Sequence, residues 1–161
     1  VLVSGDMLSF EAQQDLWREA ERWKALEHRN ILELLGTSMV DNQLVLVMER
    51  CDFSLADLIH FMPEREITLD TFETVAKGIA RGLVFLHNHN IIHRDIKPMN
   101  ILLRRDIGRV KLADFGLATV KEDAMTFART AGVRGSWPYM APEVLSEPAR
   151  WTGRADVYAL G

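Results

Sequence analysis

The segment from Leu69 to His87 constrains the fold of this chain more than any other part of the sequence. Its apolar residues recur at steps of three and four, which is the spacing of one face of an α-helix. They are Phe72, Val75, Ala76, Ile79, Leu83 and Leu86. Gly78 and Gly82 lower the helix propensity of the segment, but they permit another element to approach closely. The sequence therefore predicts one long amphipathic helix, whose apolar face would normally pack on further helices that this chain lacks.

Shorter elements are predicted on both sides of the long helix from apolar periodicity, capping residues and turn residues. In chain order they are a helix over 9–26, strands over 31–39 and 43–48, a short helix over 54–61, a very short strand at 91–92, strands over 101–103 and 110–112, a loop-like region over 114–150 and a helix that begins after Thr152. This mixture of helices and strands places the chain in the α+β class.

Composition and charge exclude several classes of protein. The chain has 161 residues, which suggests about one domain, and 48% of them are hydrophobic, which is too many for a disordered chain. A formal net charge of −4 argues against nucleic acid or an anionic membrane as the main partner. No apolar run approaches the roughly 18 residues that span a bilayer. Cys51 is the single cysteine, so no intramolecular disulfide forms, and an intracellular, cytoplasmic location is expected.

Three short segments in the second half of the chain carry the chemistry. They read His-Arg-Asp-Ile-Lys-Pro-Met-Asn over 93–100, Asp-Phe-Gly over 114–116 and Ala-Pro-Glu over 141–143. In this order and spacing they resemble the signature of eukaryotic-type protein kinase catalytic domains. Lys97 and the Gly-Ser-Trp-Pro-Tyr-Met run over 135–140 resemble the serine/threonine type. The resemblance covers essentially the whole chain.

The resemblance implies a partial two-lobed fold that is truncated at both ends. Residues 1–50 would form part of the small lobe, with the C helix and the last strands leading into the hinge. Residues 51–161 would form part of the large lobe, with the catalytic loop, the activation segment and the start of the central helix. The family's glycine-rich loop and third-strand lysine have no match before Glu19. We therefore expect this chain alone to be inactive.

The implied reaction is transfer of the ATP γ-phosphate to a protein serine or threonine hydroxyl, with ATP and Mg²⁺ as cofactors. Asp95 would accept the proton of the hydroxyl, and Lys97 would contact the transferring phosphate. Asn100 and Asp114 would be the metal ligands, since their oxygens are the hard donors that Mg²⁺ prefers. The alternative is a truncated or pseudokinase module that scaffolds partners without catalysis. A third interpretation is an incomplete gene model, with no biological existence at this length.

The resemblance also implies an adenine site. Met48 would be the gatekeeper, and the backbone groups of Glu49 and Cys51 would meet the adenine edge as the hinge. Leu102 would pack under the ring. For Met48 and Leu102, a role in the core is the alternative, and both roles are compatible.

Regulation is implied by residues around these motifs. Glu19 is the favoured partner of the upstream lysine, with Glu21 as the competing choice. Arg94 would bind a phosphate on Thr126 or Thr130, with a slight preference for Thr130. A local carboxylate partner for Arg94 is the alternative. Ser136 would bond near the catalytic residues, or it would only form a local turn.

Two more features follow from the resemblance. Trp23, Leu34, His93 and Phe115 would form the apolar stack that links the lobes, and Trp23 is bulkier than the usual residue there. Asp156 would hold the backbone of the catalytic loop. The expected partners are ATP and a protein substrate with serine or threonine, together with a chaperone or an upstream kinase. No nucleic acid and no membrane segment are expected.

Overall fold

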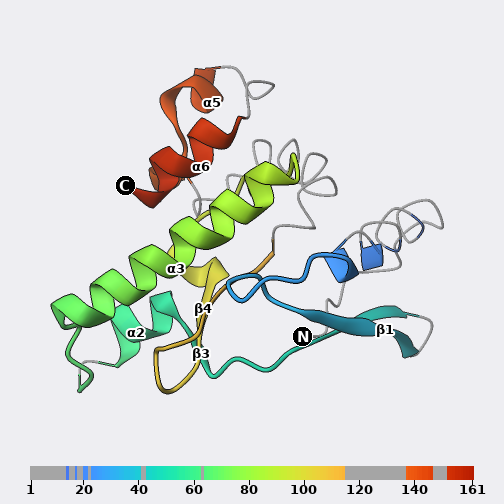
Figure 1. Cartoon of the computed structure of the whole chain (residues 1–161), viewed down its shortest axis with the longest axis horizontal. Helices are drawn as coiled ribbons and strands as arrows, with labels where there is room; N and C mark the ends of the chain where they lie inside the picture. The colour runs from blue at the N-terminus through green and yellow to red at the C-terminus, as the bar shows by residue number, and fades with distance from the viewer. Residues whose placement is uncertain are drawn as a thin grey trace.

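The computed structural model describes residues 14, 17, 20, 21, 23–40, 43–62, 64–114, 137–146 and 152–161. It shows an α+β fold with a two-stranded sheet, a three-stranded sheet and a long helix between the smaller helices (Figure 1). This confirms the predicted fold class. In the part of the chain so described, no helix is both long enough and apolar enough to cross a membrane.

The two-stranded sheet lies at one end of the molecule and consists of β1 (Leu34–Val40) and β2 (Gln43–Met48). The strands are antiparallel, which confirms the predicted hairpin. The first strand begins at Leu34, later than predicted, because Ile31 forms a parallel bridge with Leu112 instead. The N–H of Leu32 donates to the carbonyl of Leu112 at 2.8 Å. The segment before β1 is therefore tied to the second sheet.

The described part of the first predicted helix packs beside this segment. Residues 14, 17, 20, 21, 23 and 24 are helical. Ala20 and Trp23 are buried, and the indole N–H of Trp23 donates to the carbonyl of Leu32 at 2.7 Å. A buried indole needs such an acceptor, so the bulk of Trp23 is accommodated with its polar atom satisfied.

The three-stranded sheet has the order β3 (Phe53–Ser54), β4 (Ile101–Leu103) and β5 (Val110–Leu112). Both pairs are antiparallel, and β4 and β5 form the second predicted hairpin. Helix α2 (Leu55–Phe61) follows β3 directly. Its N-cap is Ser54, as expected, and Asp57 completes a capping box by accepting the Ser54 N–H at 2.8 Å.

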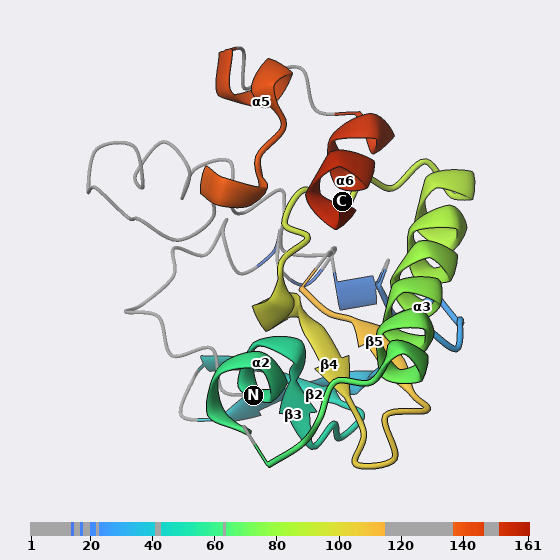
Figure 2. The same cartoon turned by 90° about the vertical axis from the view of Figure 1, so that its left-hand side faces the viewer.

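The long predicted helix is α3 (Leu69–Asn88), which flanks β4 and β5 in Figure 2. It approaches β5 closely at its glycines, where an added Cβ on Gly78 would lie 2.6 Å from Val110. Phe72, at the start of the apolar face, is 62% exposed. The helix meets the sheet through the face that contains Gly78 and Gly82, and Phe72 precedes that contact.

The remaining elements are the 3₁₀ turns η1 (Pro98–Asn100) and η2 (Trp137–Tyr139), and the helices α5 (Pro142–Ser146) and α6 (Gly153–Leu160). The two helices lie at the opposite end of the molecule from β1 and β2 (Figure 1). Thr152 caps α6 as predicted. The loop expected over 114–150 instead contains η2 and α5.

The strand predicted at 91–92 is also absent from the described residues. The N–H of Ile91 closes the end of α3 by donating to Leu86 at 2.9 Å, and neither Ile91 nor Ile92 pairs with a strand. An apolar pair needs a strand partner to become a strand, and here it leads directly into the segment that starts at His93. One buried core joins both sheets and α3, and its largest members include Ile31, Leu58, Leu86, Ile101, Leu103 and Leu112.

Candidate functional site

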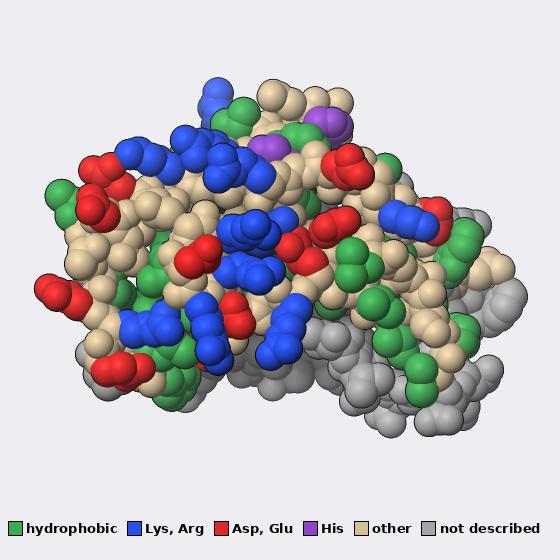
Figure 3. Space-filling model, turned by 60° about the horizontal axis from the view of Figure 1, so that its bottom comes forward, with side chains coloured by type: hydrophobic (Ala, Val, Ile, Leu, Met, Phe, Trp, Pro, Cys, Tyr) green, Lys and Arg blue, Asp and Glu red, His purple; other side chains and the backbone are tan. Residues whose placement is uncertain are grey.

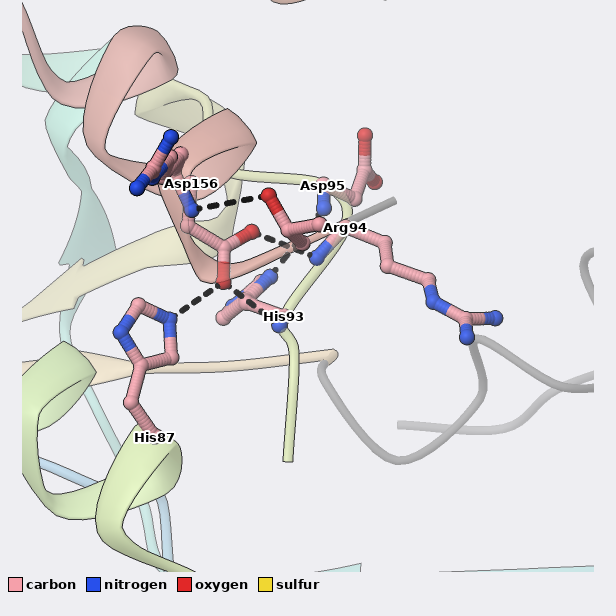
Figure 4. A network of polar contacts seen from close by, with 7 residues as sticks. His87, His93, Arg94, Asp95 and Asp156 are labelled. Carbon is pink, nitrogen blue, oxygen red and sulfur yellow. Dashed lines mark hydrogen bonds and ion pairs between the residues drawn. The ribbon is translucent and has the colours of Figure 1, made fainter. Parts of the chain in front are cut away.

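A single buried carboxylate binds the backbone of the segment from His93 to Asp95. Asp156 of α6 is 1% exposed and accepts the N–H of His93 and the N–H of Arg94, each at 2.9 Å. The Nε2 atom of His87, at the end of α3, lies 2.8 Å from the same carboxylate (Figure 4). This confirms that Asp156 holds the loop backbone. The contribution of His87 was not foreseen.

The backbone conformation is unusual at one residue of this segment, Arg94, and also at Asp114. Arg94 has φ 68° and Asp114 has φ 65°, both in the left-handed region that residues with a side chain rarely adopt. Such conformations persist only where the surroundings impose them, and they concentrate at functional sites. The two N–H bonds to Asp156 supply that constraint at Arg94.

Three of the predicted catalytic side chains lie together. The Nζ of Lys97 is 2.8 Å from Oδ2 of Asp95. The side-chain amide of Asn100 donates to the same Oδ2 at 2.7 Å and to the Asp95 carbonyl at 2.8 Å. The carboxylate of Asp95 is only 14% exposed, so these donors orient it and stabilise its charge.

Asp114 is brought to the same place by β5. The N–H of Ala113 donates to the carbonyl of Asn100 at 2.9 Å, so the residue after Ala113 lies beside the residue that ends η1. Asn100 is buried and Asp114 is half-buried. An amide oxygen and a carboxylate are donors that fit Mg²⁺. Among the described residues no group of three or more His, Cys, Asp or Glu side chains is placed to hold a metal.

A buried ion pair lies behind the predicted hinge. The Nζ of Lys111 on β5 is 2.5 Å from Oε1 of Glu49 and 3.1 Å from the carbonyl of Ile31. The N–H of Glu33 donates to the same Glu49 oxygen at 2.9 Å. Sequence analysis missed Lys111. The available signal was a lysine between the apolar residues of a predicted strand.

The predicted adenine residues include one member of this ion pair, Glu49. Met48 ends β2, Glu49 and Cys51 follow it, Leu102 lies in β4, and all four are half-buried. Within the described residues, no hydrogen bond uses the carbonyl of Glu49 or the N–H of Cys51. Burial raises the pKa of the Cys51 thiol, and the Glu49 carboxylate raises it further.

Several predicted regulatory residues lie outside the described part of the chain, namely Glu19, Thr126, Thr130 and Ser136. Glu21, the competing choice for Glu19, is helical and exposed. The side chain of Arg94 points away from Asp156 in Figure 4. Of the predicted stack, Trp23, Leu34 and His93 are buried, and Phe115 lies outside the described residues.

The comparisons with known proteins agree with the family resemblance of the sequence. The family model for the protein kinase domain matches residues 6–161. Serine/threonine-protein kinase TAO1-A of Xenopus laevis is 39% identical over 158 residues, which cover 95% of this chain and 15% of that protein. Serine/threonine-protein kinase TAO3 of Homo sapiens is 38% identical over 156 residues, covering 94% of this chain and 16% of that protein. The chain thus spans about one sixth of the length of these relatives.

Proposed function

Since this chain belongs to the protein kinase family, we propose that the protein transfers the γ-phosphate of ATP to a serine or threonine hydroxyl of a protein substrate. Protein kinases as a family use ATP and Mg²⁺. The observation that carries the proposal is the contact of Asp95 with Lys97 and Asn100, beside Asp114. Phosphoryl transfer depends mainly on positioning and charge neutralisation, which this arrangement supplies.

We assign one role to each side chain of this cluster. Asp95 accepts a hydrogen bond from the substrate hydroxyl and takes its proton. Lys97 contacts Asp95 in this structure. During transfer, its ammonium group acts as a point charge that stabilises the phosphate, and its contact with Asp95 is then partly lost. Asn100 and Asp114 hold Mg²⁺ through oxygen atoms, and when bound the metal neutralises phosphate charge.

The adenine base is proposed to lie against the hinge. Its edge would meet the carbonyl of Glu49 and the backbone of Cys51, with Met48 behind and Leu102 beneath. The ion pair of Glu49 with Lys111 supports this placement, because it fixes the hinge backbone from the side that faces β5. Residues up to 50 would then belong to the small lobe and residues from 51 to the large lobe.

The proposed regulation rests on the family resemblance. Arg94 would bind a phosphate on Thr126 or Thr130, added by an upstream kinase, while Ser136 would contact the catalytic loop. Glu19 would pair with the lysine of the third strand. A cytoplasmic location and a chaperone partner fit an enzyme with protein substrates, and the single cysteine is compatible with that setting.

The decisive experiment measures transfer of radiolabelled phosphate from ATP by the full-length protein. Asp95→Asn and Asp114→Asn should each lower kcat by at least about a hundredfold, since each removes a charge that acts in the transition state. Asp70→Asn, an exposed carboxylate in the first turn of α3, is the matched control and should leave the rate unchanged. Near-normal turnover in either site variant would show that the assignment is wrong.

A further inference from the structure

The loop between β4 and β5 concentrates positive charge. Over 104–109 it contains Arg104, Arg105 and Arg109 with a single acid, Asp106. All three arginines are exposed, and the side chain of Arg105 is 84% exposed. The loop is fixed by two backbone hydrogen bonds, from Ile107 to Arg104 at 2.8 Å and from Arg104 to Arg109 at 3.2 Å. It therefore presents three guanidinium groups from a defined backbone.

A fourth arginine is attached to this loop. The guanidinium of Arg65 donates to the carbonyl of Arg105 at 3.3 Å and lies 5.0 Å above the ring of Phe53. Asp52 is the nearby carboxylate, and it lies 4.0 Å from Nε of both Arg104 and Arg105. One carboxylate at that distance from two guanidinium groups leaves positive charge available to a ligand.

The edge of α3 extends the positive surface. Gly78 and Gly82 pack directly against β5, so the residue before each glycine lies on the flank of the helix beside that strand. These residues are Lys77 and Arg81, and both are exposed. Lys77 pairs with Glu73, whereas Arg81 forms no ion pair with any residue that the structure describes.

We call this surface the basic face, and it consists of Arg65, Lys77, Arg81, Arg104, Arg105 and Arg109. Figure 3 shows lysine and arginine side chains gathered on the side of the molecule where the β4–β5 loop lies. Asp52 and Glu73 pair with members of this set, Asp106 lies in the same loop as three of them, and the exposed Glu64 and Glu66 flank Arg65 in the sequence. The chain as a whole has a formal net charge of −4, so this positive charge is a local feature.

We propose that the basic face docks an acidic segment of a partner protein. Guanidinium groups pair with carboxylates through two parallel hydrogen bonds, and four of the six cations are arginines fixed on or beside one loop. A nucleic acid or an anionic membrane would favour a continuous positive surface, whereas Asp52, Asp106 and Glu73 interrupt this one. Spaced carboxylates of a peptide match such an interrupted pattern.

The position of the basic face relative to Asp95 fits docking. Strand β4 starts directly after Asn100, and β5 ends just before Asp114, so the site lies at one end of this hairpin and the arginine loop at the other. Three residues of strand separate them by about 10 Å along each strand. A segment bound at the loop therefore leaves the region of Asp95 accessible to a second part of the same partner.

The test uses the full-length protein and a fluorescein-labelled ten-residue peptide of alternating glutamate and alanine, followed by fluorescence polarisation. The glutamine analogue of this peptide is the matched probe. We expect the glutamate peptide to bind, the glutamine peptide to bind at least tenfold more weakly, and Arg104→Glu/Arg105→Glu to weaken glutamate-peptide binding at least tenfold. Arg154→Glu, an exposed reversal on α6, should leave this binding unchanged.

Equal binding of the two peptides would overturn the proposal, and so would unchanged binding in the Arg104→Glu/Arg105→Glu variant. Tighter binding of a single-stranded oligonucleotide, or of phosphatidylserine vesicles, than of the glutamate peptide would also overturn it. Arg104→Gln/Arg105→Gln guards against misfolding, because it removes the charges without reversing them. With a wild-type unfolding midpoint it should still lose peptide binding, and retained binding in that variant counts against the basic face.

Discussion

The ammonium group of Lys111 lies 2.5 Å from the carboxylate of Glu49, and this contact joins β5 to the segment that follows β2. The side chains are 11% and 16% exposed, so the pair is largely removed from water. Removal of one charge from such a pair leaves the other charge buried and unpaired. The folding free energy lost in this way is larger than the net contribution of the intact pair to stability. The pair therefore fixes the backbone of the proposed hinge more than it stabilises the fold.

Lys111→Met should destabilise the protein by about 3 kcal/mol, because Glu49 would remain buried and charged. The double variant Lys111→Met/Glu49→Leu should recover most of this loss in chemical denaturation. Lys77→Met is the matched control, since it removes a lysine from an exposed pair, and it should barely move the unfolding midpoint. Additive effects of the two single substitutions would contradict the coupling.

Gly78→Ala should destabilise the protein even though alanine is the better helix former. Intrinsic propensity favours alanine by about 1 kcal/mol. The new Cβ would lie 2.6 Å from Cβ of Val110, and such overpacking costs about 1–3 kcal/mol. In a Val110→Gly background, which removes the clashing Cβ together with both methyl groups, Gly78→Ala should no longer destabilise. Gly36→Ala, whose Cβ would meet nothing within 4 Å, is the control, and a loss as large there would argue against a steric cause.

Local sequence signals predicted most of the fold. The apolar period located α3, and Ser54 and Thr152 located the starts of α2 and α6, because an N-cap acts within its own turn. Hairpins were also found, since turn residues and strands adjoin in sequence. The prediction at 91–92 failed because strand pairing depends on distant elements that a local pattern does not contain.

In the predicted site too, residues that are close in sequence were predicted, whereas two residues with distant partners were missed. Asp95, Lys97 and Asn100 are close in sequence, and their mutual contacts follow from the short loop and η1. Lys111 and His87 were missed because their partners, Glu49 and Asp156, lie far away in the chain. A charged residue inside an apolar strand was the one local sign for Lys111.

Asp156→Asn should loosen the segment that starts at His93, which is the proposed catalytic loop. The carboxylate accepts two N–H groups, and an amide offers only one oxygen to replace its two, so one of the bonds to His93 and Arg94 would be lost. We expect a loss of about 2 kcal/mol and faster hydrogen exchange at these two amides. His87→Gln keeps both amide bonds and should show a smaller effect on exchange. Unchanged protection in Asp156→Asn would contradict this account.

Cys51 should react slowly with iodoacetamide at pH 7.4, because its raised pKa lowers the fraction of thiolate. Glu49→Gln removes a negative charge that raises this pKa and should speed alkylation. ATP should protect the thiol if adenine binds at the hinge. Mass spectrometry gives the rates, and protection by GTP equal to that by ATP would argue against an adenine-specific contact.

The stability of the protein should fall as the pH drops below about 6.5, in part through His28. Burial lowers the pKa of His28, and the charges of Arg29 and Lys111 lower it further. The ring stacks on Phe85 with 4.7 Å between centroids, and its Nδ1 accepts the N–H of Asn30 at 3.2 Å. These contacts favour the neutral ring in the folded state.

The sign follows from proton counting. Between the lowered folded pKa and the ordinary value near 6.5, the unfolded chain binds more protons, so stability rises with pH across this window and is complete above it. His28→Phe keeps the stack on Phe85 and removes the titration, so its melting temperature should fall less than that of the wild type between pH 7.5 and pH 5.5. Lys111→Met should also reduce the dependence, because one of the charges that lower this pKa is gone. An identical pH slope in wild type and His28→Phe, measured by differential scanning calorimetry, would assign the acid sensitivity to other groups.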